Sequence, residues 1–170
     1  LSNGLELKKN DVIDPYSYNE TLQEKMIRKA ITNHFEMEKE LLTRSTARIK
    51  PLSLFFIDNI ESYRGKEGEK GTLALFVEAE IKRHVTQLLT TETHEAYREY
   101  LENTLRDISQ SHGGYFSQDN SEKDEKIEKE IEEILHDKET LLSLDNPRRF
   151  IFSKWTLREG WDNQIGRAHV

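Results

Sequence analysis

Three stretches of the chain repeat apolar side chains at intervals of three or four positions, which is the period of an amphipathic helix. The first covers residues 18–43, where an apolar row includes Leu22, Ile31 and Phe35 while charged residues fill the remaining positions. Comparable rows run through residues 72–89 and 96–108. The pattern therefore predicts three helices, each with one buried face.

Three shorter segments have the length of strands. Residues 52–57 are almost continuously apolar after Pro51, before which the helical conformation is disfavoured. Their brevity and lack of clean alternation favour a central parallel strand that is covered on both faces. Residues 149–153 and 115–117 are further strand candidates. Because these strands alternate with helices, we expect an α/β fold with a parallel sheet.

Parallel α/β sheets bind ligands beyond the carboxyl ends of their strands. The loops that begin at Asp58, Gln118 and Ser153 are therefore the places where chemistry is expected.

The composition narrows the class of protein. One domain with a real core fits into 170 residues, of which 35% are hydrophobic and 34% charged. Cysteine is absent, which excludes disulfides, thiolate zinc sites and cysteine nucleophiles. No apolar run approaches the roughly 18 residues that span a bilayer, and the chain does not start with a secretion signal. We therefore expect a cytoplasmic protein with no membrane association.

Most of the net charge of −7 belongs to one segment. Residues 119–140 hold ten acidic residues and four lysines, a balance of −6 that leaves −1 for the remainder. This near-neutral remainder permits contact with nucleic acid. A very charged helix is expected over residues 121–136. Its acidic residues are most simply interpreted as a solvent-exposed face, and the alternative is a surface that docks a partner.

Two motifs of catalytic type occur in weak form. Residues 65–72 are close to the sequence of a phosphate-binding loop, which ends in Gly-Lys-Thr. Here the last three residues are Lys-Gly-Thr, and this exchanged order favours a surface loop. Asp58, Glu80 and Lys82 have the spacing of a metal-dependent nuclease. Glu80 and Lys82 nevertheless fall in a helical row, so a solvated helix face is favoured.

The histidines do not predict a metal site. None of the six forms a pair four residues apart with a glutamate in helical register, so zinc is not expected. His34 is expected beside a helix–sheet interface, and His112 could face a cleft at the end of a strand.

The most specific segment is Phe-Ile-Phe-Ser-Lys-Trp-Thr-Leu-Arg-Glu-Gly-Trp-Asp-Asn at residues 150–163. A buried strand delivers the Ser153 hydroxyl into a turn that contains Thr156, Gly160 and Asp162. Small and hydroxyl residues let the backbone approach a phosphodiester closely, and a carboxylate can accept a hydrogen bond from a ribose hydroxyl. The alternative is an ordinary turn between a strand and a helix.

This segment resembles motif V of superfamily 2 helicases and translocases, and it is most similar to the form found in the Res subunit of type III restriction endonucleases. Residues 49–64 resemble the motif IV strand of that family, and residues 112–117 resemble its next strand. Together the matches cover residues 18–163 in the right order.

The resemblance implies an incomplete RecA-like parallel sheet with helices on both faces and a helical insertion at residues 72–109. Residues 18–163 would form a partial second RecA-like lobe, from motif IV to motif V, after a lead-in loop at residues 1–17. The resemblance places Gly160 and Asp162 on the ATP side of the cleft between two lobes. It assigns contacts with DNA to Ser53, Phe55, Ser153, Lys154 and Thr156.

The parent protein is then expected to use ATP and Mg²⁺, to move along and cleave double-stranded DNA, and to pair with a modification methyltransferase subunit. No phosphate loop, magnesium-binding acidic motif, arginine finger or nuclease domain occurs in these residues. We therefore expect no catalytic or metal-binding residue in this chain, and neither ATP hydrolysis nor DNA cleavage by the chain alone.

Residues 164–170 are interpreted as a non-native tail. The six residues from Ile165 to Val170 read like a translated sequencing adapter, and Gln164 stands where the family continues with proline. Two other functions remain open: a non-catalytic helical interaction module whose acidic helix docks a basic partner, and another superfamily 2 DNA helicase.

Overall fold

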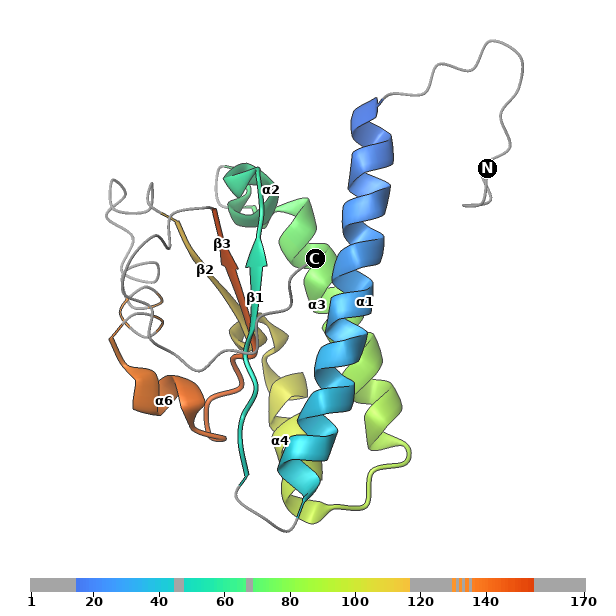
Figure 1. Ribbon diagram of the computed structural model, residues 1–170, viewed down its shortest axis with the longest axis vertical. Helices are drawn as coiled ribbons and strands as arrows, with labels where there is room; N and C mark the ends of the chain where they lie inside the picture. Colours follow the sequence, from blue (N-terminus) through green and yellow to red (C-terminus); the bar gives the residue numbers. More distant parts are fainter. Residues whose placement is uncertain are drawn as a thin grey trace, which may run out of the picture.

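The computed structural model describes residues 15–44, 48–66, 69–116 and 136–154, together with residues 130, 132 and 134. The helices and strands are arranged as in Figure 1. In chain order they are α1 (Pro15–Thr43), β1 (Ser53–Phe56), α2 (Ile60–Arg64), α3 (Thr72–Leu89), α4 (Glu95–Arg106), the 3-10 helix η1 (Ile108–Ser111), β2 (His112–Tyr115), α6 (Lys138–Leu142) and β3 (Phe150–Ser153). The three helices predicted from apolar spacing are present as α1, α3 and α4, with η1 after the last.

The described strands form a parallel sheet in the order β1-β3-β2, which confirms the α/β prediction. The prediction that residues 52–57 form the central strand is wrong, because β3 is central and β1 lies beside it. Every residue of β3 is buried, whereas β1 is half-buried and ends in an exposed residue. An apolar run thus identifies a strand but does not give its place in the sheet.

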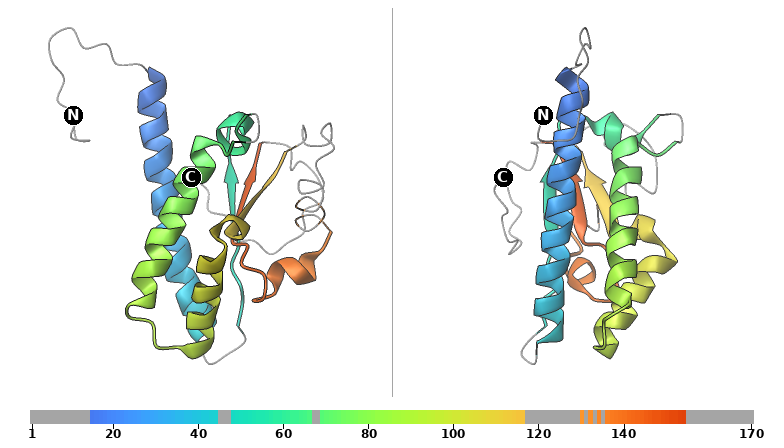
Figure 2. Two further views of the ribbon diagram at one scale, coloured as in Figure 1. Left: turned by 180° about the vertical axis from the view of Figure 1, so that it is seen from behind. Right: turned by 90° about the vertical axis from the view of Figure 1, so that its right-hand side faces the viewer.

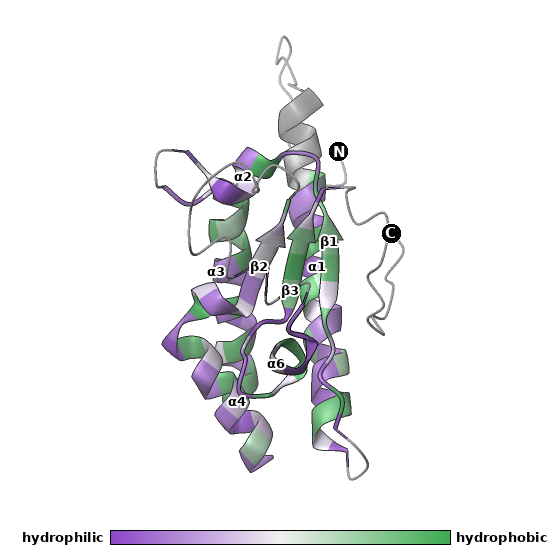
Figure 3. Cartoon of the chain, turned by 90° about the vertical axis from the view of Figure 1, so that its left-hand side faces the viewer, coloured by the Kyte–Doolittle hydropathy of each residue, from purple (hydrophilic) through white to green (hydrophobic). Residues whose placement is uncertain are grey.

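Helices cover both faces of the sheet, as predicted. Helices α1, α3 and α4 lie on one face (Figures 1 and 2) and form the main core with it. Phe150 and Phe152 of β3 belong to this core together with Phe35 of α1. Helix α6 lies on the other face of the sheet (Figure 3), where its Leu141 and Ile151 of β3 belong to a smaller hydrophobic cluster. Among the described residues no helix is long and apolar enough to cross a bilayer.

Strand β2 begins at His112, where the family resemblance places it, and not at Tyr115 as the apolar pattern predicts, and it contains Gly113 and Gly114. A Cβ on Gly113 would lie 1.9 Å from Nη1 of Arg148, and one on Gly114 would lie 2.5 Å from the Phe116 ring. The glycines therefore let an arginine and an aromatic ring lie directly on the strand. Phe116 follows the strand and is fully buried.

Two five-residue helices were not predicted, because they are too short to show a helical period. Helix α2 begins directly after β1, where the Asn59 side chain accepts hydrogen bonds from the backbone N–H of Glu61 (2.9 Å) and Ser62 (3.3 Å). Gly65 ends it with a φ of 80°. Most of the charged helix expected at residues 121–136 lies outside the described residues, while Glu130, Glu132 and Ile134 are helical.

Candidate nucleic-acid interface

The carboxyl edge of the sheet is formed by three residues that lie level with one another. Phe56 of β1 and Tyr115 of β2 each pair with Ser153 of the central strand. The ladder continues past the edge, because the backbone N–H of Ile57 donates to the carbonyl of Ser153 at 2.9 Å. Asp58 then follows as an exposed residue. Two of the three predicted loops, those at Asp58 and Ser153, therefore start side by side.

Ser153 and Lys154 are the predicted contacts that the structure places at this edge. Ser153 is fully buried, and its Oγ has no hydrogen-bond partner among the described residues. Lys154 is exposed directly after it. Thr156, Gly160 and Asp162, as well as the loop at Gln118, lie outside the described residues.

Ser53 and Phe55 occupy different surroundings. Ser53 is at the amino end of β1, opposite Phe150, and its Oγ lies 2.8 Å from Nδ1 of His34. Phe55 stacks on Phe152 with ring centroids 5.0 Å apart and packs against the main core. Ser53 thus contacts α1 and Phe55 contacts the main core, and neither is brought together with Ser153 at the carboxyl edge.

Phe56 is the edge residue that sequence reasoning missed. Its side chain is 53% exposed, although its neighbour Phe55 packs into the core. Successive strand residues point to opposite faces, so a shift of one position exchanges a core ring for an exposed one. The signal was available as two consecutive phenylalanines at the end of a strand, but nothing in the sequence indicated which faced solvent.

A buried ionic network lies at the other end of β3. Arg149 and Glu38 are both fully buried, and Nε of Arg149 donates to Oε2 of Glu38 at 2.6 Å. Arg149 Nη1 also donates to Thr104 Oγ1 (2.8 Å) and to the carbonyl of Pro147 (2.9 Å). The guanidinium carbon lies 3.9 Å from the centroid of the Tyr100 ring. The network therefore joins α1 and α4 to the start of the central strand.

His34 and Tyr97 complete the surroundings of Glu38. The Tyr97 hydroxyl donates to Glu38 Oε1 at 3.1 Å, and Nε2 of His34 lies 3.4 Å from Oε2. His34 is buried against β1 and the Phe150 ring, which confirms its predicted place at a helix–sheet interface. Sequence reasoning did not predict the ionic network, although Glu38 falls in the same helical row as the buried Ile31 and His34.

The network sets the charges of its members. Burial raises the pKa of Glu38, but the Arg149 charge and the contacts with His34 outweigh burial and lower it to about 2. Burial lowers the pKa of His34 below its usual 6.5, and Glu38 offsets only part of that effect. Burial alone would lower the pKa of Arg149, but the nearby Glu38 carboxylate has the larger effect and raises it, so Arg149 keeps its charge. Burial next to Glu38 raises the pKa of Tyr97, so its hydroxyl stays a donor.

Strand β2 is tied to its surroundings by a second set of polar contacts. Nε2 of His112 donates to Glu78 Oε1 (3.1 Å), and Nδ1 lies 2.7 Å from the Tyr63 hydroxyl. His112 is buried at the amino end of β2, so it does not face an open cleft at the end of a strand as predicted. Arg64 and Arg148 both bind the Glu130 carboxylate, at 2.7 and 3.3 Å.

The two weak catalytic motifs do not form catalytic sites. Glu80 is buried and forms ion pairs with Arg28 (3.0 Å) and Arg83 (2.8 Å). The prediction of a solvated helix face is therefore wrong for Glu80, whereas Lys82 is exposed as predicted. The loop before α3 follows α2 rather than a strand, and its Lys70 binds Glu78, which excludes a phosphate loop. Within the described part of the chain, no three acidic or histidine side chains gather as a metal site would require.

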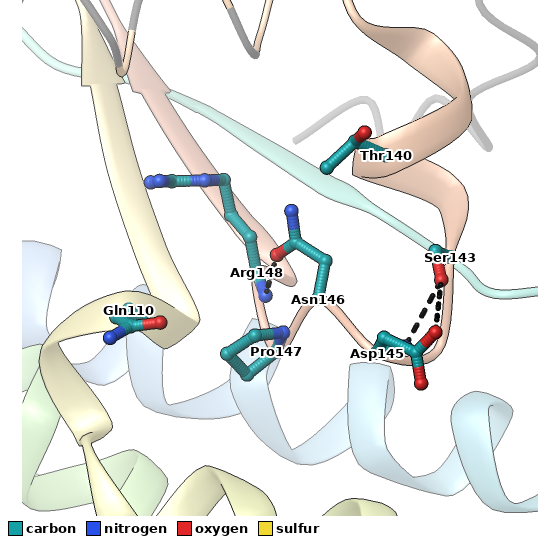
Figure 4. A pocket seen from close by; sticks show the side chains of 7 residues that line it. All are labelled: Gln110, Thr140, Ser143, Asp145, Asn146, Pro147 and Arg148. Atoms are coloured by element: carbon teal, nitrogen blue, oxygen red, sulfur yellow. Dashed lines mark hydrogen bonds between the residues drawn. The ribbon is translucent and has the colours of Figure 1, made fainter.

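A cavity of about 420 Å³ lies at the amino end of β3 (Figure 4). Its walls are Gln110, Thr140, Ser143, Asp145, Asn146, Pro147 and Arg148. The turn before β3 is held from within by Lys50, whose Nζ donates to the carbonyls of Leu141 (2.7 Å), Ser143 (3.0 Å) and Asn146 (2.6 Å). The cavity is therefore at the opposite end of the central strand from Ser153.

Comparison with known proteins gives the family. No family model matches the chain. It is 63% identical over 163 residues to the type III restriction-modification enzyme EcoPI Res subunit of Escherichia phage P1, and 61% identical over 163 residues to the EcoP15I Res subunit of Escherichia coli. The StyLTI Res subunit of Salmonella typhimurium is 40% identical over 185 residues. Each match covers 96% of this chain and 17 or 18% of the relative. The chain therefore belongs to the family of type III restriction-modification enzyme Res subunits.

Proposed function

We propose that this chain is part of the ATP-dependent DNA translocase of a type III restriction enzyme, and that the carboxyl edge of its sheet contacts the DNA backbone. The observation that carries the proposal is the position of Ser153 and Lys154 at the end of the central, fully buried strand of a sheet from a Res family member. Residues at this position in a parallel sheet are held rigidly and face the region where ligands bind.

The expected chemistry at this edge is binding rather than bond breaking. Lys154 supplies a positive charge for a phosphate, and the exposed ring of Phe56 supplies an apolar surface beside it. Contacts of this kind position a protein on DNA without reading its sequence. Sequence recognition would then come from the modification methyltransferase subunit proposed as the partner.

ATP and Mg²⁺ are proposed for the whole enzyme. ATP would be held between two lobes and would supply the energy for movement, with Gly160 and Asp162 on this chain's side. These two residues lie outside the described part of the chain. Family membership favours this function over another superfamily 2 helicase and over a non-catalytic helical interaction module.

The DNA contact is tested in the phage P1 Res subunit with this chain in place of its matching segment. Lys154→Ala is expected to weaken binding equally for DNA of different sequences. It should also lower the slope of log affinity against log salt by about 0.9, the value of one phosphate contact. Lys82→Ala, which removes an exposed lysine on α3, is the matched control. An unchanged slope in the Lys154 variant would exclude this residue as a backbone contact.

A further inference from the structure

Helix α1 has a second apolar stripe besides the one that packs on the sheet. Leu22, Met26 and Met37 are exposed by 49, 42 and 43%, and Ala30 and Leu41, at helical spacing from them, are half-buried. At about 3.6 residues per turn, the three exposed side chains fall within roughly one sixth of a turn of one another. These five side chains, which we call the outer stripe, lie along one side of the helix, with the polar Asn33 between Ala30 and Met37.

The outer stripe is separate from the buried face of α1. The buried residues that line the main core and the ionic network include Ile27, Ile31, Phe35, Glu38 and Leu42. Helical geometry places their centre roughly 140° away from the outer stripe. A helix of 29 residues with apolar side chains on two sides is typical of the interior of a larger protein, not of a surface.

Charged residues flank the outer stripe in a defined order. Lys25 and Lys29 are exposed beside its first half, and Glu36 and Glu40 are exposed beside its second half. A helix that packs along this stripe is complementary when its acidic residues lie opposite the two lysines and its basic residues lie opposite the two glutamates. Steps of four residues, from Leu22 through Met26 to Ala30 and from Met37 to Leu41, match a ridge that packed helices present to each other.

We propose that the outer stripe of α1 is an internal interface of the Res polypeptide, covered by an amphipathic helix from outside these 170 residues. The chain corresponds to 17% of the length of the phage P1 relative, so most of such a subunit is available as the occupant. The proposal depends on family membership and not on the DNA contact at Ser153 and Lys154. A second copy in antiparallel orientation would present the same order of charges, and the experiment must separate the two.

Photo-crosslinking in the complete subunit tests the proposal. The phage P1 Res subunit that carries this chain is made with benzoyl-phenylalanine in place of Met26, and in a control in place of Glu99, which is exposed on α4. An equal mixture of ¹⁴N- and ¹⁵N-labelled subunits, with the modification subunit present, is irradiated and analysed by mass spectrometry. We expect position 26 to crosslink within one polypeptide, to a helical peptide outside the chain, in several-fold higher yield than position 99.

The other outcomes contradict the proposal. Crosslinks between differently labelled subunits would identify a second copy as the occupant, and crosslinks to the modification subunit would identify that partner. A yield no higher than at position 99 would show that the stripe is exposed. The same replacement at the aligned position of the unaltered phage P1 subunit repeats the measurement without a chimera.

Discussion

At the scale of single residues, the central feature is a charged pair in the core of the domain. Arg149 and Glu38 are separated by 111 positions in the sequence, yet both side chains are fully buried and bind each other at 2.6 Å. A buried pair of this kind contributes little more to stability than well-packed apolar residues would. Removal of one partner, however, strongly destabilises the fold because it leaves the other charge buried and unpaired. The consequence of the pair is therefore specificity, because it fixes how α1 and α4 meet the start of β3.

A double-mutant cycle on this pair tests that account. We expect Arg149→Met to destabilise the domain by about 3–5 kcal/mol, because the Glu38 carboxylate stays buried without its main partner. Glu38→Leu should destabilise the domain by a similar amount, because the Arg149 guanidinium then stays buried without its carboxylate partner. The double variant should lose far less free energy of unfolding than the sum of the two single losses. Urea unfolding of all four proteins measures these free energies. Additive losses would show that the two charges do not depend on each other.

The same network predicts how stability depends on pH. His34 has a lowered pKa in the folded state, so the unfolded chain takes up its proton first and stability falls as the pH drops below about 6.5. Glu38 has a folded pKa of about 2 against 4.5 when unperturbed, so its contribution is present above pH 4.5 and is lost between 4.5 and 2. Unfolding midpoints measured from pH 8 to 3 should therefore decline in two steps.

His34→Gln separates the two steps, since it removes the imidazole but leaves Glu38 with Arg149. The decline that begins near pH 6.5 should disappear in this variant, and the decline below pH 4.5 should remain. A profile identical to that of the original chain would show that His34 is not the group that titrates.

At the scale of secondary-structure elements, the periodic parts of the chain were predictable and the aperiodic parts were not. Helices α1 and α3 carry long apolar rows, and every residue of β3 is buried. Strand β2 contains two glycines, which have no side chain to reveal a period. Strand order and buried charge pairs depend on residues far apart in sequence, so no local pattern reports them.

Consecutive residues of β1 give a sharp test of the candidate interface. Phe55→Ala removes a ring that stacks on Phe152 in the main core, and we expect a loss of about 3 kcal/mol in the free energy of unfolding. Phe56→Ala removes a ring that is 53% exposed, and we expect a loss below about 1 kcal/mol. In the complete subunit, however, Phe56→Ala should weaken DNA binding.

The pair of variants distinguishes contact from folding. Binding is measured by titration of labelled DNA under conditions where urea unfolding shows both variants to be folded. Weaker binding by Phe55→Ala alone would place the contact on the core side of β1 and would rule out the exposed ring.

At the scale of the whole molecule, the parts that stabilise the fold and the part proposed to bind DNA lie at opposite ends of the sheet. The Arg149 network and the Lys50 contacts hold the amino end of β3, whereas Ser153 and Lys154 stand at its carboxyl end. A strand anchored at one end can present residues at its other end in a fixed position. The chain nevertheless corresponds to 17% of the phage P1 relative, so ATP-driven movement is a property to be sought in the complete enzyme.

The last prediction compares the chain by itself with the complete subunit. The purified chain is expected to show no DNA-stimulated ATP hydrolysis, because its sequence contains neither a phosphate loop nor an arginine-finger motif. Within the phage P1 Res subunit, Asp162→Ala should lower ATPase activity with or without DNA, whereas Thr156→Ala should mainly lower its stimulation by DNA. Lys82→Ala serves as the control on an exposed helix position. Magnesium-dependent ATPase activity in the isolated chain, or unchanged activity in both variants, would contradict the assignment of this segment to the motor.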